Sequence, residues 1–181
     1  MKIKLLSAAL GLAIAGSAFA ASEPMVGGAA MYPTKNIIQN AVNSKDHTTL
    51  VAAVKAGGLV RTLEGPGPFT VFAPTNAAFA SLPAGAVDTL LKPENMATLD
   101  KILTYHVVPG RFDSRMLDQR IANGGGKTVL KTVQGEPLTV QGSGKNLVVT
   151  DDKGGTARIT IADVYQSNGV IQVVDRVLMP N

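Results

Sequence analysis

Between residues 36 and 105 the apolar residues recur at helical spacing. Leu50, Val51 and Val54 would share one face of a helix that Asp46 could cap and that Gly57 and Gly58 would end. The same spacing predicts two more amphipathic helices, one around Val87, Leu90 and Leu91 and one around Leu99, Ile102 and Leu103. Each of these helices should bury one apolar stripe.

A short β-rich run interrupts this helical half. Residues 69–73 read Phe-Thr-Val-Phe-Ala and lie between a Gly-Pro-Gly-Pro segment and Pro74, which predicts a strand. Thr75 or Asn76 could then cap a short helical turn that carries Ala78 and Phe79.

After Tyr105 the pattern changes to short β-branched runs separated by Gly, Asn and Asp. These runs predict strands at residues 128–133, 137–140, 147–150, 157–161 and 170–178. Helices in one half and strands in the other indicate an α+β domain, in which the helical segment covers a mostly antiparallel sheet. A βαβ dinucleotide fold is disfavoured.

The N-terminus resembles a secretory signal peptide. Lys2 and Lys4 precede an apolar stretch from Leu5 to Ala15, and Ala18-Phe19-Ala20 supplies a small-residue cleavage site. We expect a signal peptide at 1–20, a flexible lead-in at 21–34 with unpacked methionines, and a single domain at 35–181. The alternative is an uncleaved N-terminal anchor. Export would place the protein in the periplasm or outside the cell.

Composition narrows the function classes. The chain has no cysteine, which excludes a disulfide framework, a thiolate metal site and a cysteine nucleophile. Its net charge of +4 includes Lys2 and Lys4 of the predicted leader, and only 4% of its residues are aromatic, so nucleic-acid binding has little support. We expect no cofactor, no metal site and no membrane-spanning segment in the mature chain.

Several short motifs lack features of the binding sites that they partly match. Gly126-Lys127-Thr128 lacks the earlier glycine and the following helix of a phosphate loop. The segment 151–155 lacks the ligand pattern of a calcium loop and predicts a solvated turn. Asp113 and Asp118 should be ordinary surface carboxylates, and two histidines, His47 and His106, are too few for a multi-histidine metal centre.

Two residues invite sharper hypotheses. His106 follows Tyr105 in an apolar context, where a hydrogen-bonded structural histidine is the favoured interpretation and a catalytic one the alternative. Strand alternation puts Asp175 on the same side as Ile171 and Val173, so either the strand bends or the carboxylate accepts hydrogen bonds from backbone N–H groups or a hydroxyl.

Three segments together resemble the fasciclin (FAS1) domain family, in matching order and spacing. They cover residues 69–79, 104–110 and 168–180, within a domain from about Lys35 to Pro180. The motif residues for which the resemblance implies a structural role are Phe69, Phe72, Pro74, Thr75, Asn76, Phe79, Gly169 and Asp175. The candidates for partner binding or for a structural role are Tyr105, His106, Val107, Val108, Pro109 and Gly110.

The resemblance implies a wedge-shaped, mostly antiparallel β-sandwich covered by a helical layer. It also implies an extracellular adhesion or matrix-interaction module with no catalytic residues shared across the family. We therefore expect an exported, non-enzymatic interaction module that recognises an envelope or matrix component, either protein or polysaccharide. The alternatives are a small-ligand binding protein or enzyme with a pocket near Tyr105 and His106, and a passive envelope protein with weak partners.

Overall fold

The computed structural model describes residues 23–181. The predicted signal peptide therefore lies outside the described residues. In the order of the chain, the helices and strands are β1 (Met25–Val26), β2 (Ala29–Ala30), α1 (Ile37–Ala41), η1 (Lys45–His47), α2 (Thr48–Ala56), α3 (Val60–Glu64), β3 (Phe69–Pro74), α4 (Asn76–Ala80), α5 (Ala86–Leu90), η2 (Pro93–Asn95), α6 (Met96–Tyr105), β4 (Val107–Pro109), α7 (Ser114–Asn123), β5 (Lys127–Lys131), β6 (Pro137–Gln141), β7 (Val148–Thr150), β8 (Thr156–Gln166) and β9 (Gly169–Val174).

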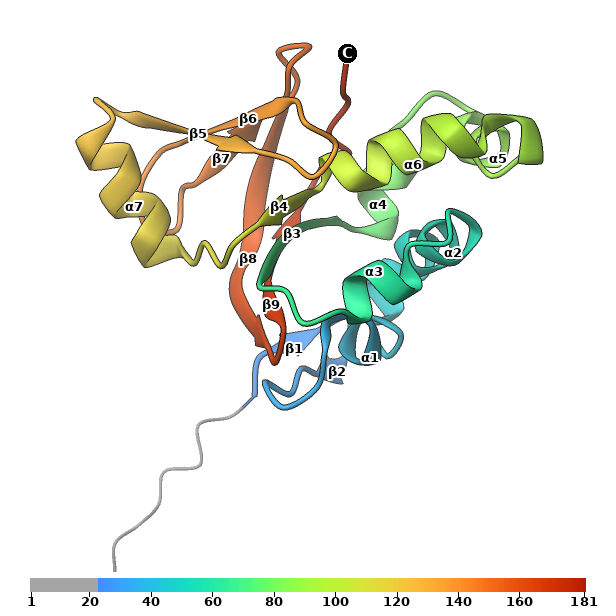
Figure 1. Ribbon diagram of the computed structural model, residues 1–181, viewed down its shortest axis with the longest axis horizontal. Coiled ribbons are helices and arrows are strands. Elements are labelled where there is room, and N and C mark those ends of the chain that lie inside the picture. Colours follow the sequence, from blue (N-terminus) through green and yellow to red (C-terminus); the bar gives the residue numbers. More distant parts are fainter. Residues whose placement is uncertain (1–22) are drawn as a thin grey trace, which may run out of the picture.

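The fold is α+β, and its main sheet is mostly antiparallel, as predicted. Seven strands pair in the order β4-β3-β9-β8-β7-β6-β5, and within this sheet only β3 and β9 run parallel. The sheet curls until its two edges nearly meet, where the Val133 N–H donates to the Val107 carbonyl oxygen at 2.8 Å. Figure 1 shows α1 to α6 on one side of this curled sheet and α7 at its far end.

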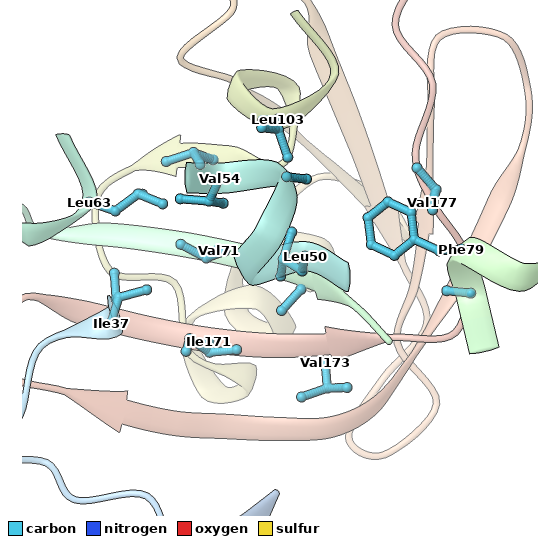
Figure 2. Close-up of a cluster of buried hydrophobic side chains, with 14 of the residues drawn as sticks. Ile37, Leu50, Val54, Leu63, Val71, Phe79, Leu103, Ile171, Val173 and Val177 are labelled. Atoms are coloured by element: carbon cyan, nitrogen blue, oxygen red, sulfur yellow. The ribbon is translucent and has the colours of Figure 1, made fainter. Parts of the chain in front are cut away.

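The central strands β3 and β9 are buried on both faces. Val71 and Ala73 of β3 face a first core beneath the helices, whereas Phe72 faces a second core inside the curled sheet. Figure 2 shows part of the first core, where Val54 of α2 lies above Val71 and Leu50 of the same helix lies beside it. Burial on both faces explains why these strands read as continuous apolar runs rather than as alternating ones.

Helix α7 is the main element that the sequence analysis missed. Residues 114–123 form a ten-residue helix that Asp113 caps by accepting a hydrogen bond from the Met116 N–H at 2.8 Å. Of this helix, Leu117 and Ile121 are buried in the second core. Two apolar residues four apart within a polar segment gave too weak a periodic signal to separate this helix from the strands around it.

The prediction that Asp46 caps α2 was wrong. Asp46 lies within η1, and the Thr49 N–H in the first turn of α2 donates instead to the Asn76 side-chain oxygen at 3.0 Å. Thr75 caps α4, where its hydroxyl accepts from the Ala78 N–H at 3.2 Å. Asn76 thus ties the start of α4 to the start of α2, a long-range contact that local spacing does not encode.

The prediction that Met31 is unpacked was also wrong, although Met25 is exposed as expected. Val26 and Met31, which lie in and just after the β1–β2 hairpin, are 4% and 2% exposed in the first core. The Lys45 N–H donates to the Gly27 carbonyl oxygen at 3.1 Å and holds this hairpin against η1. Isolated apolar residues among glycines and alanines carry no periodic signal, so their burial depended on tertiary contacts.

The last two strands differ from the predicted ranges. Strand β8 continues to Gln166 because bulges between Ile159 and Val164 let it pair first with β7 and then with β9. Strand β9 ends at Val174, so Asp175 is exposed and its carboxylate accepts from the Arg158 N–H at 2.7 Å. The end of the strand at Val174 accounts for the exposure of Asp175, and the expected hydrogen bond from a backbone N–H to its carboxylate is present.

Candidate functional site

Tyr105 and His106 lie at the junction of α6 and β4 and point into different parts of the interior. Tyr105 is 0% exposed in the second core. Its hydroxyl donates to the Pro137 carbonyl oxygen at 2.8 Å and accepts from the Asp152 N–H at 2.9 Å. Burial raises the pKa of Tyr105 to about 12, and the Asp152 hydrogen bond opposes part of that rise. The phenol therefore stays neutral at physiological pH.

His106 is 3% exposed and uses both ring nitrogens within the fold. Its Nδ1–H donates to the Ile102 carbonyl oxygen at 2.8 Å, and its Nε2 accepts from the Leu178 N–H at 3.0 Å. Burial lowers the pKa of His106 to about 4, against the weaker effects of the Ile102 hydrogen bond and the Asp151 charge. A neutral ring with both nitrogens engaged is poorly placed for acid–base work.

The Tyr-His motif, the name used here for residues 105–110, continues into the short edge strand β4. Val107 and Val108 are buried, Pro109 is exposed, and Gly110 is half-buried with a positive φ of 107°. The Gly110 carbonyl oxygen accepts from the Thr70 hydroxyl at 2.7 Å. Of the six motif residues, Pro109 presents the most open surface.

The motif residues of β3 and β9 lie together at the centre of the sheet. Phe72 and Pro74 are buried, as is Phe79 of the adjoining α4, and Phe69 is half-buried. A Cβ on Gly169 would lie 2.1 Å from the Phe69 carbonyl oxygen. The neighbouring strands therefore approach too closely for any side chain at position 169.

Asn168 was not singled out, yet it connects three segments. Its buried side chain accepts from the Ile37 N–H at 3.0 Å and donates to the Leu63 and Gly65 carbonyl oxygens at 2.7 and 2.8 Å. These bonds fix α1 and the end of α3 against the β8–β9 turn. Its position beside Gly169, in the segment 168–180 that resembles the family, was the sequence feature that could have indicated this role.

Asp151 lies in the turn predicted at residues 151–155, but its side chain is buried and hydrogen-bonded rather than solvated. It is 8% exposed, and its carboxylate accepts from the Gly155 N–H at 2.7 Å and the Met179 N–H at 2.9 Å. It thus anchors the C-terminal segment to the β7–β8 turn. Among residues 23–181, no three His, Asp or Glu side chains gather as a metal site would require.

Asp113 and Asp118 do not converge on a common site. Asp113 caps α7, and Asp118 accepts from the Gly144 N–H at 2.9 Å. Both carboxylates therefore stabilise local structure.

Two hollows are lined in part by residues of the Tyr-His motif. The first, called here the edge groove, is an open groove of about 500 Å³ between β4 and β5. It is lined by Val108, Pro109, Phe112, Arg120, Val129, Leu130, Lys131, Thr132 and Val133. The second, called here the helical cleft, is an apolar cavity of about 50 Å³ beneath α1, α2 and α3 that contacts His106. Tyr105 lines neither hollow, so neither of them encloses both Tyr105 and His106.

Comparison with known proteins identifies the relatives of this chain. A model described as "Fasciclin domain" matches residues 45–180. Protein sll1483 from Synechocystis is 44% identical over 86% of this chain and 79% of its own length. Immunogenic protein MPB70 from Mycobacterium bovis is 37% identical over 93% of this chain and 89% of its own length.

One further relative is named as a cell surface protein, and one solved structure shares the fold. Cell surface glycolipoprotein MPB83 from Mycobacterium bovis is 33% identical over 88% of this chain and 62% of its own length. The solved structure of a FAS1 domain pair from the insect cell adhesion molecule Fasciclin I matches with a TM-score of 0.71 at 16% identity. This match covers 80% of the present chain and about half (51%) of the two-domain chain, and it establishes the similarity in fold alone.

Proposed function

The chain belongs to the fasciclin domain family, and from that premise we propose that it is an exported, non-enzymatic interaction module. It acts by surface recognition of an envelope or matrix component. The leader-like pattern at residues 1–20 and a relative named as a cell surface glycolipoprotein support export. We expect cleavage after Ala20 and release into the periplasm or the medium.

A binding role fits the chemistry of the interior better than catalysis does. Tyr105 and His106 each use their polar atoms in hydrogen bonds to backbone groups. Catalysis would need a nucleophile, base or metal ligand directed toward a reacting atom. Among the described residues, none of the Tyr-His side chains meets that requirement.

The edge groove is the observation that carries this proposal. It lies between the two edge strands of the sheet, which approach each other at the Val133–Val107 hydrogen bond, and an edge strand can pair with an added strand. Val129 and Val133 are 58% and 41% exposed, so two exposed apolar side chains flank one groove. Strand edges and exposed apolar side chains favour an extended protein segment over a polysaccharide.

The charge of the residues that line the groove further restricts the kind of partner that fits it. Arg120 and Lys131 line the groove without any lining carboxylate, and the Arg120 guanidinium lies 4.9 Å from the centre of the Phe112 ring. An acidic extended segment of a partner protein would satisfy both cations. We therefore expect the partner to add a strand beside β4 or β5 and to place its acidic side chains near these residues.

The test is affinity capture with matched variants. The protein of residues 21–181 is immobilised, and separate envelope, periplasmic and extracellular-polymer fractions of the source cell are passed over it. The proposal expects saturable retention of one protein, lost in Val129→Glu and Lys131→Glu and retained in Val42→Glu. Val42 is a matched control because it is 47% exposed and does not line the groove.

Equal retention by all variants would refute the edge groove as the binding surface. Retention of a polysaccharide would refute strand addition while leaving an interaction role in place. If no fraction yields a saturable partner, the passive envelope role becomes the better description.

A further inference from the structure

The helical cleft has an apolar interior and opens toward one exposed cation. Its floor is formed by Val71 of β3 and Ile171 of β9, and its walls are formed by residues of α1, α2 and α3. Figure 2 shows Ile37, Val54, Leu63 and Val71 around this region, between α2 and the two central strands. Of the lining residues, Lys55 is exposed, and five are half-buried: Ile38, Ala41, Val51, Leu59 and Val60.

Four polar residues line the cleft, and the fold uses most of their polar atoms. The Ser44 hydroxyl and His47 Nδ1 share a hydrogen bond of 2.9 Å, and both nitrogens of His106 are engaged as described above. His47 Nε2 has no hydrogen-bond partner within residues 23–181. Lys55 likewise has no carboxylate within ion-pair distance in that part of the chain.

The cleft is uncharged inside and positive at its opening. His47 is 4% exposed, and burial lowers its pKa against the opposing effects of the Ala73 carbonyl and the Asp46 charge. Both histidines are thus neutral at physiological pH, and Lys55 is the cation among the lining residues. An apolar channel with one cation at its mouth complements a molecule that has a hydrocarbon chain and one anionic end.

We propose that the helical cleft binds the hydrocarbon chain of a fatty-acid anion, with the carboxylate beside Lys55. The chain would lie against the apolar side chains of α1, α2, β3 and β9. A volume of about 50 Å³ accepts only part of such a chain, so the walls must separate as it enters. Helices α1 and α3 have five residues each, against nine in α2, and Asn168 holds only the start of α1 and the end of α3. This site is separate from the edge groove and does not depend on a partner there.

The test is isothermal titration of the protein of residues 21–181 with octanoate, decanoate and dodecanoate, with the matching alcohols as uncharged probes. Burial of the chain predicts about fourfold tighter binding for each added methylene until the chain outgrows the cleft. Lys55→Met should weaken carboxylate binding about two- to fivefold and leave alcohol binding unchanged, because a partly exposed ion pair contributes modestly.

Variants that fill the cleft separate it from other surfaces. Ala41→Trp at the mouth should abolish binding of both probe series, whereas Ala52→Trp on the exposed face of α2 should not. Val60→Trp provides a second blocking variant if Ala41→Trp does not fold. Affinity that is independent of chain length, or unchanged binding to a folded blocking variant, would overturn the proposal. So would an equal loss of carboxylate and alcohol binding in Lys55→Met.

Discussion

His106 should make the stability of this protein depend on pH in a defined window. Its pKa is about 4 in the fold, against 6.5 for a free side chain. Between these values the unfolded chain binds a proton at this residue and the folded chain does not. The contribution of His106 to the free energy of unfolding should therefore be complete above about pH 6.5 and should fall as the pH drops toward 4.

The size of the effect follows from the same shift. One pKa unit corresponds to about 1.4 kcal/mol, so His106 alone should remove about 3 kcal/mol of stability between neutral pH and pH 4. His106→Gln removes the titrating ring and perturbs the bonds to Ile102 and Leu178. At pH 7 it should lower the free energy of unfolding by about 1–3 kcal/mol, the cost of a poorly satisfied buried group.

The assay is urea denaturation of the parent protein and His106→Gln at several pH values from 4 to 8. The difference between the two proteins should be largest at neutral pH and should close, or reverse, as the pH approaches 4. Other titrating groups, His47 among them, are present in both proteins and cancel to a first approximation in the difference. Two stability curves that stay parallel over the whole range would show that His106 is not buried in its neutral form.

Three further substitutions test the hydrogen bonds that hold the motifs together. Tyr105→Phe should cost about 1–3 kcal/mol in urea denaturation, because the Pro137 oxygen and the Asp152 N–H lose their partner; an unchanged midpoint would contradict this account. Asn168→Ala should cost about 2–4 kcal/mol, since three backbone groups lose their bonds together, and Ser167→Ala is the exposed neighbouring control. Asp175→Ala should lower the melting temperature by a few degrees through loss of the Arg158 N–H bond; a melting curve that superimposes on the parent's would exclude a role for that carboxylate.

The sequence by itself determined the fold class and the position of most elements. The spacing of Leu99, Ile102 and Leu103 defined α6, and the apolar run at 69–73 defined β3, because each pattern expresses burial along one short segment. The three motif segments also identified the family. Such patterns are local, and they predict a helix or strand wherever one element has enough apolar residues at a regular period.

Tertiary structure decided which residues are held by distant partners. The Asn76 side chain forms a hydrogen bond with the backbone of α2, and the Asn168 side chain forms hydrogen bonds with the backbone of α1 and α3. Met31 packs in a core formed by later segments. No local period records these contacts, because the partner lies tens of residues away along the chain. The edge groove and the helical cleft have the same origin: each is a space left between elements whose own sequences specify only which faces are buried.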